Sequence, residues 1–152
     1  MNSITLKFAK LDVDSFAPTL ASVDAAAYDL YSTRNVSIDR EKPSVIINTG
    51  IVVQIPVGYV GLICSRSGMA ANSGLYVLNA PGVIDSDYRG ELRVILSSAR
   101  ASGLDYGIMR GDRIAQLMIV PLPKVTLEEV SVSDMDATER GQCGFGSTGR
   151  GL

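Results

Sequence analysis

Short runs of apolar, mostly β-branched residues alternate with turn residues along most of the chain. The clearest runs cover residues 45–49, 51–55, 59–63, 92–96, 114–120 and 125–130. Fifteen glycines and six prolines punctuate the sequence, so that a turn separates short strands about every ten residues. Such regular spacing is typical of an all-β sandwich or barrel. The pattern therefore predicts one all-β domain, in which Gly50 divides two neighbouring strands.

One short helix is the main exception to this pattern. No apolar stripe of helical period extends far enough for a long helix. Residues 67–72 fit a short helix that stops before Gly74. Residues 28–31 alternate like a strand, and 24–27 could form one further helical turn. The expected architecture is thus β-rich, with a single short helix.

The last part of the chain differs from the rest in composition. Residues 131–139 are polar and weakly patterned, which is typical of a linker. The following segment is rich in glycine and lacks apolar periodicity, so it is expected to be mobile unless a ligand orders it. The predicted organisation is a β domain over residues 1–130, followed by a linker and C-terminal tail over residues 131–152.

Composition and charge exclude several classes of protein. The chain has 152 residues, of which 46% are apolar and 20% charged, as in ordinary globular domains. No apolar run approaches the ~20 residues that span a bilayer, so we expect no membrane insertion. The net charge of −2 provides no electrostatic footprint for a long nucleic acid. The N-terminus has no basic region followed by an apolar stretch, so we expect an intracellular protein, cytoplasmic or nuclear.

The complete absence of histidine restricts the available chemistry. Ser-His-Asp and Cys-His catalysis are impossible, as is an HExxH zinc site. Acid–base chemistry must come from Asp, Glu, Lys, Tyr or Cys side chains. Cys64 and Cys143 have no CxxC spacing, so they cannot form a zinc site by themselves, and nothing in the sequence requires a disulfide between them.

Two segments have the residue types of an anion site. Arg66 and Ser67 stand at the start of the expected helix, where backbone N–H groups lack partners. The tail segment 144–149 matches GxGxxG, but the chain ends three residues later, so no Rossmann helix can follow. For each segment taken alone a structural explanation is favoured: Ser67 as an N-cap with Arg66 in a surface ion pair, and a disordered tail.

Two further segments carry candidate polar groups. Asp85 and Asp87 would face the same side of an extended chain, and a carboxylate is the obvious general base where histidine is absent. A hairpin turn is the alternative explanation, and it suits Asp87 better than Asp85. Gln116 is the one polar residue inside an apolar run. Its alternative explanation is an outward-facing position, with Asp112 paired to a nearby arginine.

Together and in this order, five stretches closely resemble the motifs of the trimeric deoxyuridine triphosphate nucleotidohydrolases (dUTPases). They are AAYDLYS at 26–32, RSGMA at 66–70, GVIDSDYRGE at 82–91, GDRIAQL at 111–117 and RGQCGFGSTG at 140–149. The resemblance implies a distorted jelly-roll fold and a homotrimer with active sites shared between subunits. It departs from the usual motifs at Ala27, Ser65, Asn72 and Cys143, none of which is a proposed catalytic group.

The resemblance also implies a reaction. Asp85 would act as the general base for a water that attacks the α-phosphorus of dUTP in line, giving dUMP and pyrophosphate. The cell would thereby limit uracil incorporation into DNA and obtain dUMP for thymidylate synthesis. Mg²⁺ is the implied cofactor, held by the substrate phosphates and waters with no direct protein ligand. Asp29 would support it through a water.

Substrate contacts follow from the same resemblance. A β-hairpin over about residues 77–88 would hold uracil, with Tyr88 under the sugar. The C-terminal tail would close over the site, with Arg140 on the γ-phosphate and a phenylalanine stacked on the base. The residues implied are, for the phosphates, Arg66, Ser67, Gly68 and Gln116; for the nucleoside, Asn79, Val83, Ile84 and Tyr88; and in the tail, Arg140, Phe145, Gly146, Ser147 and Thr148.

Three other functions are compatible with parts of the pattern. The first is a dCTP deaminase of the same superfamily, although the segment 85–91 suits hydrolysis at the α-phosphate better. The second is a nucleotide-binding regulatory protein without turnover, which would not need Asp85. The third is a structural jelly roll such as a capsid subunit, which would not need the Arg66 and Arg140 segments together.

Overall fold

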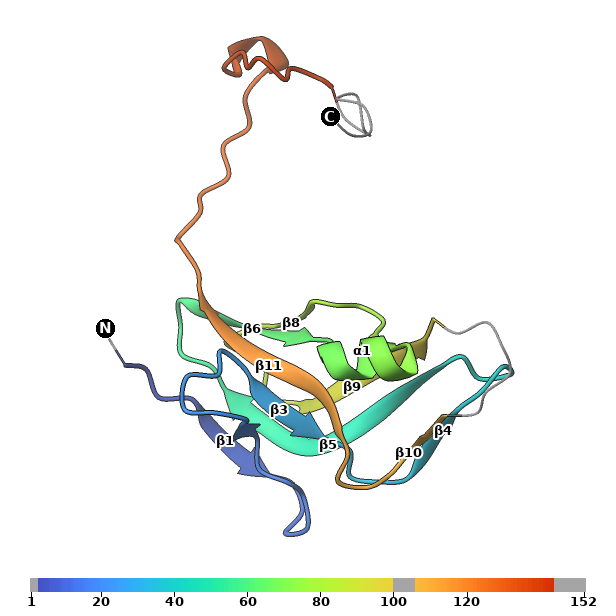
Figure 1. Cartoon of the computed structure of the whole chain (residues 1–152). Helices are drawn as coiled ribbons and strands as arrows, with labels where there is room; N and C mark the ends of the chain where they lie inside the picture. The colour runs from blue at the N-terminus through green and yellow to red at the C-terminus, as the bar shows by residue number, and fades with distance from the viewer. Residues whose placement is uncertain (1–2, 100–105, 144–152) are drawn as a thin grey trace.

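Two antiparallel β-sheets pack face to face and enclose the core (Figure 1). The computed structural model describes residues 3–99 and 106–143. One sheet has the order β1 (Lys7–Lys10), β5 (Ser44–Gln54), β9 (Glu91–Ser98), β7 (Leu75–Val77). The other has the order β2 (Thr19–Leu20), β3 (Tyr28–Tyr31), β11 (Arg113–Pro121), β6 (Tyr59–Cys64), β8 (Gly82–Ile84). A small ribbon pairs β10 (Tyr106–Ile108) with β4 (Val36–Ile38). The all-β prediction is confirmed.

Alternation along the strands builds the core between the sheets. On β9, Leu92, Val94 and Leu96 are almost fully buried, while Arg93 between them is exposed. The facing sheet contributes residues such as Leu117 from β11. Because successive side chains of a strand point to opposite faces, these runs specify which side of each sheet is covered.

Strand β5 is one bulged strand, so the prediction that Gly50 separates two strands is wrong. Gly50 has φ of 67°, and the pairing with β9 shifts register between Asn48 and Val52. Glu91 supports this bulge, since its carboxylate accepts hydrogen bonds from the Gly50 N–H at 2.7 Å and the Asn48 side-chain amide at 2.5 Å. A Cβ at Gly50 would lie 2.0 Å from Ser15 Oγ, so only glycine fits.

The segment from Val77 to Tyr88 is not the hairpin that was expected. Strand β7 pairs with β9, whereas β8 pairs with β6 in the opposite sheet. The loop between them therefore carries the chain across from one sheet to the other. Neither β7 nor β8 pairs with the other, although they are consecutive in the sequence. A local sequence pattern cannot predict which strands will pair.

The predicted helix is confirmed as α1 (Ser67–Ser73). It ends at Gly74, whose φ of 68° provides the left-handed C-cap, with its N–H donating to the carbonyls of Met69 and Ala70. Residues 24–27 form turns and bends instead of helix. In the described part of the chain, no helix is long and apolar enough to cross a membrane.

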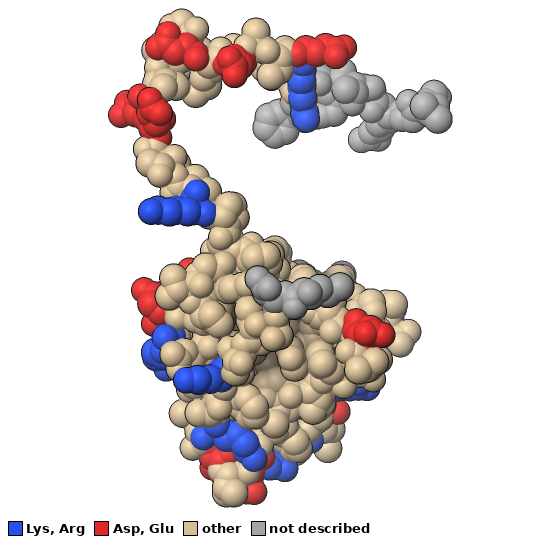
Figure 2. All heavy atoms as spheres, turned by 90° about the vertical axis from the view of Figure 1, so that its left-hand side faces the viewer, with Lys and Arg blue, Asp and Glu red and all other residues tan. Residues whose placement is uncertain are grey.

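An extended arm leaves the body after β11 (Figure 1). The Leu122 N–H still donates to the Gly58 carbonyl at 2.7 Å, and then the chain runs away from both sheets, with one 3₁₀ turn, η1 (Val132–Asp134). Figure 2 shows the arm standing clear of the body. The strand predicted over 125–130 is absent: Val125 and Leu127 are 72% and 94% exposed, because no strand of this chain lies beside them.

Candidate active site

The predicted site residues of the body fall into two groups at opposite ends of strand β6. Arg66 follows the carboxyl end of β6. At the other end, Gly61 pairs with Ile84 of β8, so the next residue, Asp85, lies toward Val60. Val60 and Arg66 are six positions apart along β6 and the two residues after it, which is up to about 20 Å at ~3.3 Å for each position of an extended chain. Within one chain the two groups are therefore far apart.

The first group is assembled by the central strand β11. In its register, Gln116 lies opposite Cys64 of β6 on one side and Asp29 of β3 on the other. Arg66 comes two residues after Cys64. Strand pairing thus brings together three of the five sequence motifs, from β3, the end of β6 and β11.

Asp29 is the buried charge of this group. Its side chain is only 3% exposed, and its two oxygens accept from Arg66 Nε at 3.0 Å and Arg113 Nη1 at 3.2 Å. These are the only ion pairs in the described residues. The alternative that Asp112 pairs with an arginine is wrong, because Asp112 Oδ2 accepts instead from the Met109 N–H and stabilises the preceding turn.

Ser67 and Gly68 open helix α1 and are both exposed. The N-cap residue is Arg66, in extended conformation and without a side-chain cap, so the explanation of Ser67 as N-cap is wrong. Ser65 has a structural use: its hydroxyl oxygen accepts from the Val77 N–H at 2.8 Å. This bond ties the start of the helix to β7 and leaves Ser67 and Gly68 facing solvent.

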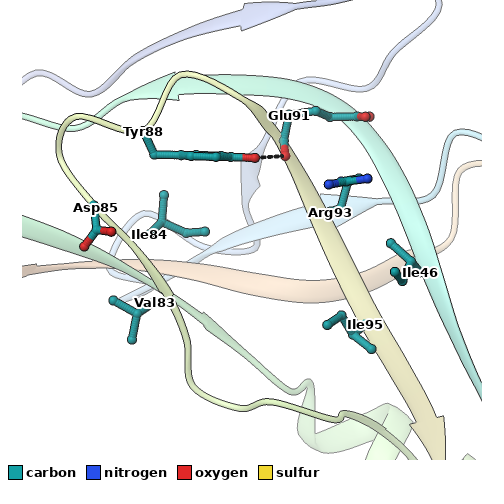
Figure 3. Close-up of a pocket in the computed structure, with 8 residues that line it drawn as sticks. All are labelled: Ile46, Val83, Ile84, Asp85, Tyr88, Glu91, Arg93 and Ile95. Carbon is teal, nitrogen blue, oxygen red and sulfur yellow. Dashed lines mark hydrogen bonds between the residues drawn. The ribbon is translucent and has the colours of Figure 1, made fainter.

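The second group lines a cavity of about 240 Å³ beside β8 and β9. Figure 3 shows Asp85 at the start of the 85–90 loop, with apolar side chains from both sheets below it. Asp85 and Asp87 do not lie on one extended face, because the Tyr88 N–H donates to the Asp85 carbonyl and closes a turn. The lining residues are Ile46, Val83, Ile84, Asp85, Tyr88, Glu91, Arg93 and Ile95.

Tyr88 folds back over Gly90 in this group. Its hydroxyl donates to the Glu91 carbonyl at 3.0 Å (Figure 3). A Cβ at Gly90 would lie 2.3 Å from Tyr88 Oη, closer than atoms can pack. The absence of a side chain at Gly90 therefore determines where the Tyr88 ring lies.

The remaining predicted residues line neither the cavity beside β8 and β9 nor the Asp29 ion-pair group, or lie beyond the described structure. Asn79 is exposed in the loop between β7 and β8. Arg140 is exposed on the arm, where its Nε donates to the Cys143 carbonyl at 2.9 Å. Phe145, Gly146, Ser147 and Thr148 lie outside the described residues.

Comparison with known proteins decides the family. The dUTPase family model matches residues 14–149, which is nearly the whole chain and includes all five motifs. The chain belongs to the dUTPase family.

Curated relatives of this dUTPase chain are similar along most of their length. A deoxyuridine 5'-triphosphate nucleotidohydrolase of Anaplasma marginale is 47% identical over 133 residues, 87% of this chain and 88% of that protein. One from Syntrophotalea carbinolica is 41% identical over 151 residues, 98% of this chain and 99% of that protein.

Solved dUTPase structures have the same jelly-roll fold. A Staphylococcus bacteriophage 80alpha dUTPase variant, solved with dUpNHpp, has a TM-score of 0.84 at 29% identity, over 97% of this chain and all of that one. A dUTPase variant from phage phi11 of S. aureus, described with a structural Mg(II) ion, has a TM-score of 0.75 at 28% identity, over 87% of this chain and all of that one. The jelly-roll expectation is confirmed.

Sequence analysis of this dUTPase missed three residues that hold the site together. Arg113 pairs with Asp29, Glu91 braces the β5 bulge, and Gly90 gives Tyr88 its place. Arg113 and Glu91 look like ordinary surface charges in the sequence, because their partners lie 84 and 41 residues away. One weak indication for Gly90 was present in the sequence: it follows Tyr88 and Arg89 within the motif at 82–91, where a residue without a side chain leaves room for a neighbouring ring.

Replacing Gly90 with alanine is expected to lower the preference of this dUTPase for dUTP over UTP. The new methyl group would push the Tyr88 ring away from Glu91 and from the expected place of the sugar. We expect kcat/KM for dUTP to fall roughly tenfold, with a smaller fall for UTP. Ser86→Ala, a small change in the same loop, is the control. Unchanged discrimination in a folded G90A protein would contradict this use of Tyr88.

Proposed function

We propose that this chain hydrolyses dUTP to dUMP and pyrophosphate, with Asp85 as the general base. The observation that carries the proposal is the family match over residues 14–149, a region that contains the proposed base Asp85 and every proposed substrate-binding residue. Asp85 adds support: it is exposed at the rim of an apolar cavity, where a carboxylate can meet both a water and a nucleotide.

The proposed step is a single in-line displacement. Asp85 accepts a proton from the attacking water as the water oxygen bonds to the α-phosphorus. The bond from the α-phosphorus to the oxygen that bridges to the β-phosphate then breaks, and pyrophosphate leaves with that oxygen. Positioning matters most, since the water must lie within hydrogen-bond reach of Asp85 and opposite the leaving group.

Each substrate group has proposed partners. The phosphates would be held by Arg66, Ser67, Gly68 and Gln116, which lie on or beside the β3–β11–β6 group. Asn79, Val83 and Ile84 would contact uracil, Tyr88 the sugar, and Arg140, Phe145, Gly146, Ser147 and Thr148 would close over the bound nucleotide. The main-chain carbonyl and N–H groups near Val83 and Ile84 would reject cytosine, because its mismatched donor leaves buried polar groups unpaired.

We propose that three subunits share each active site. Asp85 and Arg66 lie toward opposite ends of β6, an arrangement that favours their meeting one triphosphate from different subunits. The arm supports the same idea, since it presents Val125, Leu127 and Val132 to solvent and carries Arg140 away from its own body. A closed trimer of C3 symmetry, with residues 131–152 as linker and closing tail, satisfies both observations.

We propose that Mg²⁺ binds to this site together with the substrate. In residues 3–99 and 106–143 no three Asp, Glu or Cys side chains form a group that could hold a metal. As the family resemblance implies, the phosphates and waters would supply its ligands, and the bound ion would neutralise charge on the phosphates. A water-mediated contact from Asp29 to Mg²⁺ stays a prediction. Such a water would share the carboxylate with Arg66 and Arg113, because both Asp29 oxygens already accept hydrogen bonds from these arginines.

The decisive experiment is pyrophosphate release from dUTP, dCTP, dTTP and UTP, with and without Mg²⁺. We expect rapid release from dUTP alone, dependent on Mg²⁺. Ammonia release from dCTP would identify a deaminase instead, and tight dUTP binding without turnover would identify a regulatory protein. Failure to bind any of the four nucleotides would leave a structural jelly roll as the better reading.

A further inference from the structure

Asp29, Arg66 and Arg113 form a buried ion-pair group in the first part of the site. Asp29 lies on β3, Arg66 precedes α1, and Arg113 begins β11, so the group joins three segments that are distant in sequence. A buried carboxylate needs paired charges, and here two guanidinium groups satisfy one carboxylate. The three side chains together retain one net positive charge.

Arg66 is held at two of its three side-chain nitrogens. Its Nε donates to Asp29 Oδ1 at 3.0 Å, and its Nη1 donates to the Arg113 carbonyl at 3.1 Å. Its side chain is 21% exposed, so the guanidinium is largely packed in place. An arginine fixed in this way needs little ordering when it meets a ligand, which favours binding.

Arg113 stands beside it with a freer side chain. One nitrogen, Nη1, pairs with Asp29, while the side chain is 49% exposed. Both arginines line a cavity of about 270 Å³ next to α1, together with Met69, Tyr106 and Asp112 among others. Two guanidinium groups that share one buried carboxylate and face one cavity suit a ligand with several negative oxygens.

We propose that Asp29 is a positioning residue that holds Arg66 and Arg113 side by side, so that the pair grips the polyphosphate of the substrate. Arg113 thereby joins Arg66 and Arg140 as a third phosphate-binding arginine. The inference rests on the proposed function, which assigns Arg66 to the phosphates. It gives Asp29 a role through arginines, different from a water-mediated role at Mg²⁺.

A double-mutant cycle on the intact chain tests this role. The variants are Asp29→Asn, Arg66→Gln and both together, with Asp39→Asn as the matched control. Asp39 also accepts hydrogen bonds from neighbouring N–H groups, but in the turn at 39–42. Each variant is first compared with wild type in thermal stability, and then in affinity for dUpNHpp and dUMP and in its Mg²⁺ requirement.

We expect Asp29→Asn to weaken dUpNHpp binding by roughly 10- to 100-fold, the loss expected when a hydrogen bond between charged groups is broken. Affinity for dUMP should fall much less, and the Mg²⁺ midpoint should stay constant. In the double variant the loss should exceed that of Arg66→Gln alone but stay below the sum of the two single losses, because Asp29 acts through both Arg66 and Arg113. Asp39→Asn should leave both affinities unchanged.

Several results would overturn the inference. Additive losses in the cycle would show that Asp29 acts independently of Arg66. Equal losses for dUpNHpp and dUMP would indicate general disorder of the fold. If excess Mg²⁺ returned the dUpNHpp affinity of Asp29→Asn to the wild-type value, Asp29 would act on Mg²⁺ rather than through the arginines.

Arg113→Gln keeps the inference testable if Asp29→Asn does not fold. This change affects a half-exposed side chain, so we expect a folded protein with weakened dUpNHpp binding and nearly intact dUMP binding. Unchanged dUpNHpp affinity would reject the arginine pair. These are binding measurements, so a wild-type chain that binds dUpNHpp without hydrolysing dUTP would reject the proposed reaction separately.

Discussion

Replacing Asp85 with asparagine is expected to abolish dUTP hydrolysis while leaving dUTP binding nearly intact. The amide keeps the size of the carboxylate at the end of β8, so the loop and cavity should persist. It cannot accept the proton of the attacking water, and loss of a general base costs about 10²- to 10⁴-fold in rate. Single-turnover kinetics would measure the rate, and calorimetry with dUpNHpp would measure binding.

Asp87→Asn provides the matched control for that experiment. Asp87 lies two residues away in the same loop and is also exposed, within the turn that the Tyr88 N–H closes. We expect its activity to stay close to wild type. If Asp85→Asn turned over at the wild-type rate, or if only Asp87→Asn were inactive, the assigned base would be wrong. Because the chain has no histidine, no imidazole can replace Asp85 as the general base in this experiment.

Truncation after Glu139 is expected to cost turnover far more than stability. It removes Arg140 and the Gly-rich tail, and loss of an arginine that stabilises the transferring phosphates is worth on the order of 10³-fold. The core cluster lies entirely between Leu30 and Leu117, and residues 139–143 are exposed, so the thermal midpoint should change little. Steady-state kinetics with dUTP and thermal unfolding of the same sample would separate the two effects.

A shorter truncation after Gly149 is the control for the tail. It removes only residues 150–152, beyond the last motif and beyond the matched family region. We expect nearly full activity from it. Full activity of the chain that ends at Glu139 would refute the role of the tail as a lid over the bound nucleotide.

Local patterns predicted the elements whose determinants are close together in sequence. Strands β6, β9 and β11 were found because β-branched alternation is a property of neighbouring residues. Helix α1 was found because Gly74 ends it in a conformation that favours glycine. The motif residues were found for the same reason, since each motif is a short continuous stretch.

Local sequence patterns did not predict how distant segments of the chain pair with one another. Gly50 looked like a strand break, but Glu91, 41 residues later, supports a bulge there. Residues 125–130 have strand composition, yet they form none because no strand of the same chain offers them hydrogen bonds. Residues 77–88 looked like a hairpin, but β7 and β8, the two strands within it, lie in different sheets.

The sequence by itself determined the all-β class, the short helix and the set of polar groups available for catalysis without histidine. Only the tertiary structure decided which of those groups meet: it placed Asp29 against Arg66 and Arg113, 37 and 84 residues away, and it put Asp85 at the other end of β6. The physical reason is that side-chain alternation and turn preference are local, whereas ion pairs and strand register depend on which segments the folded chain brings together.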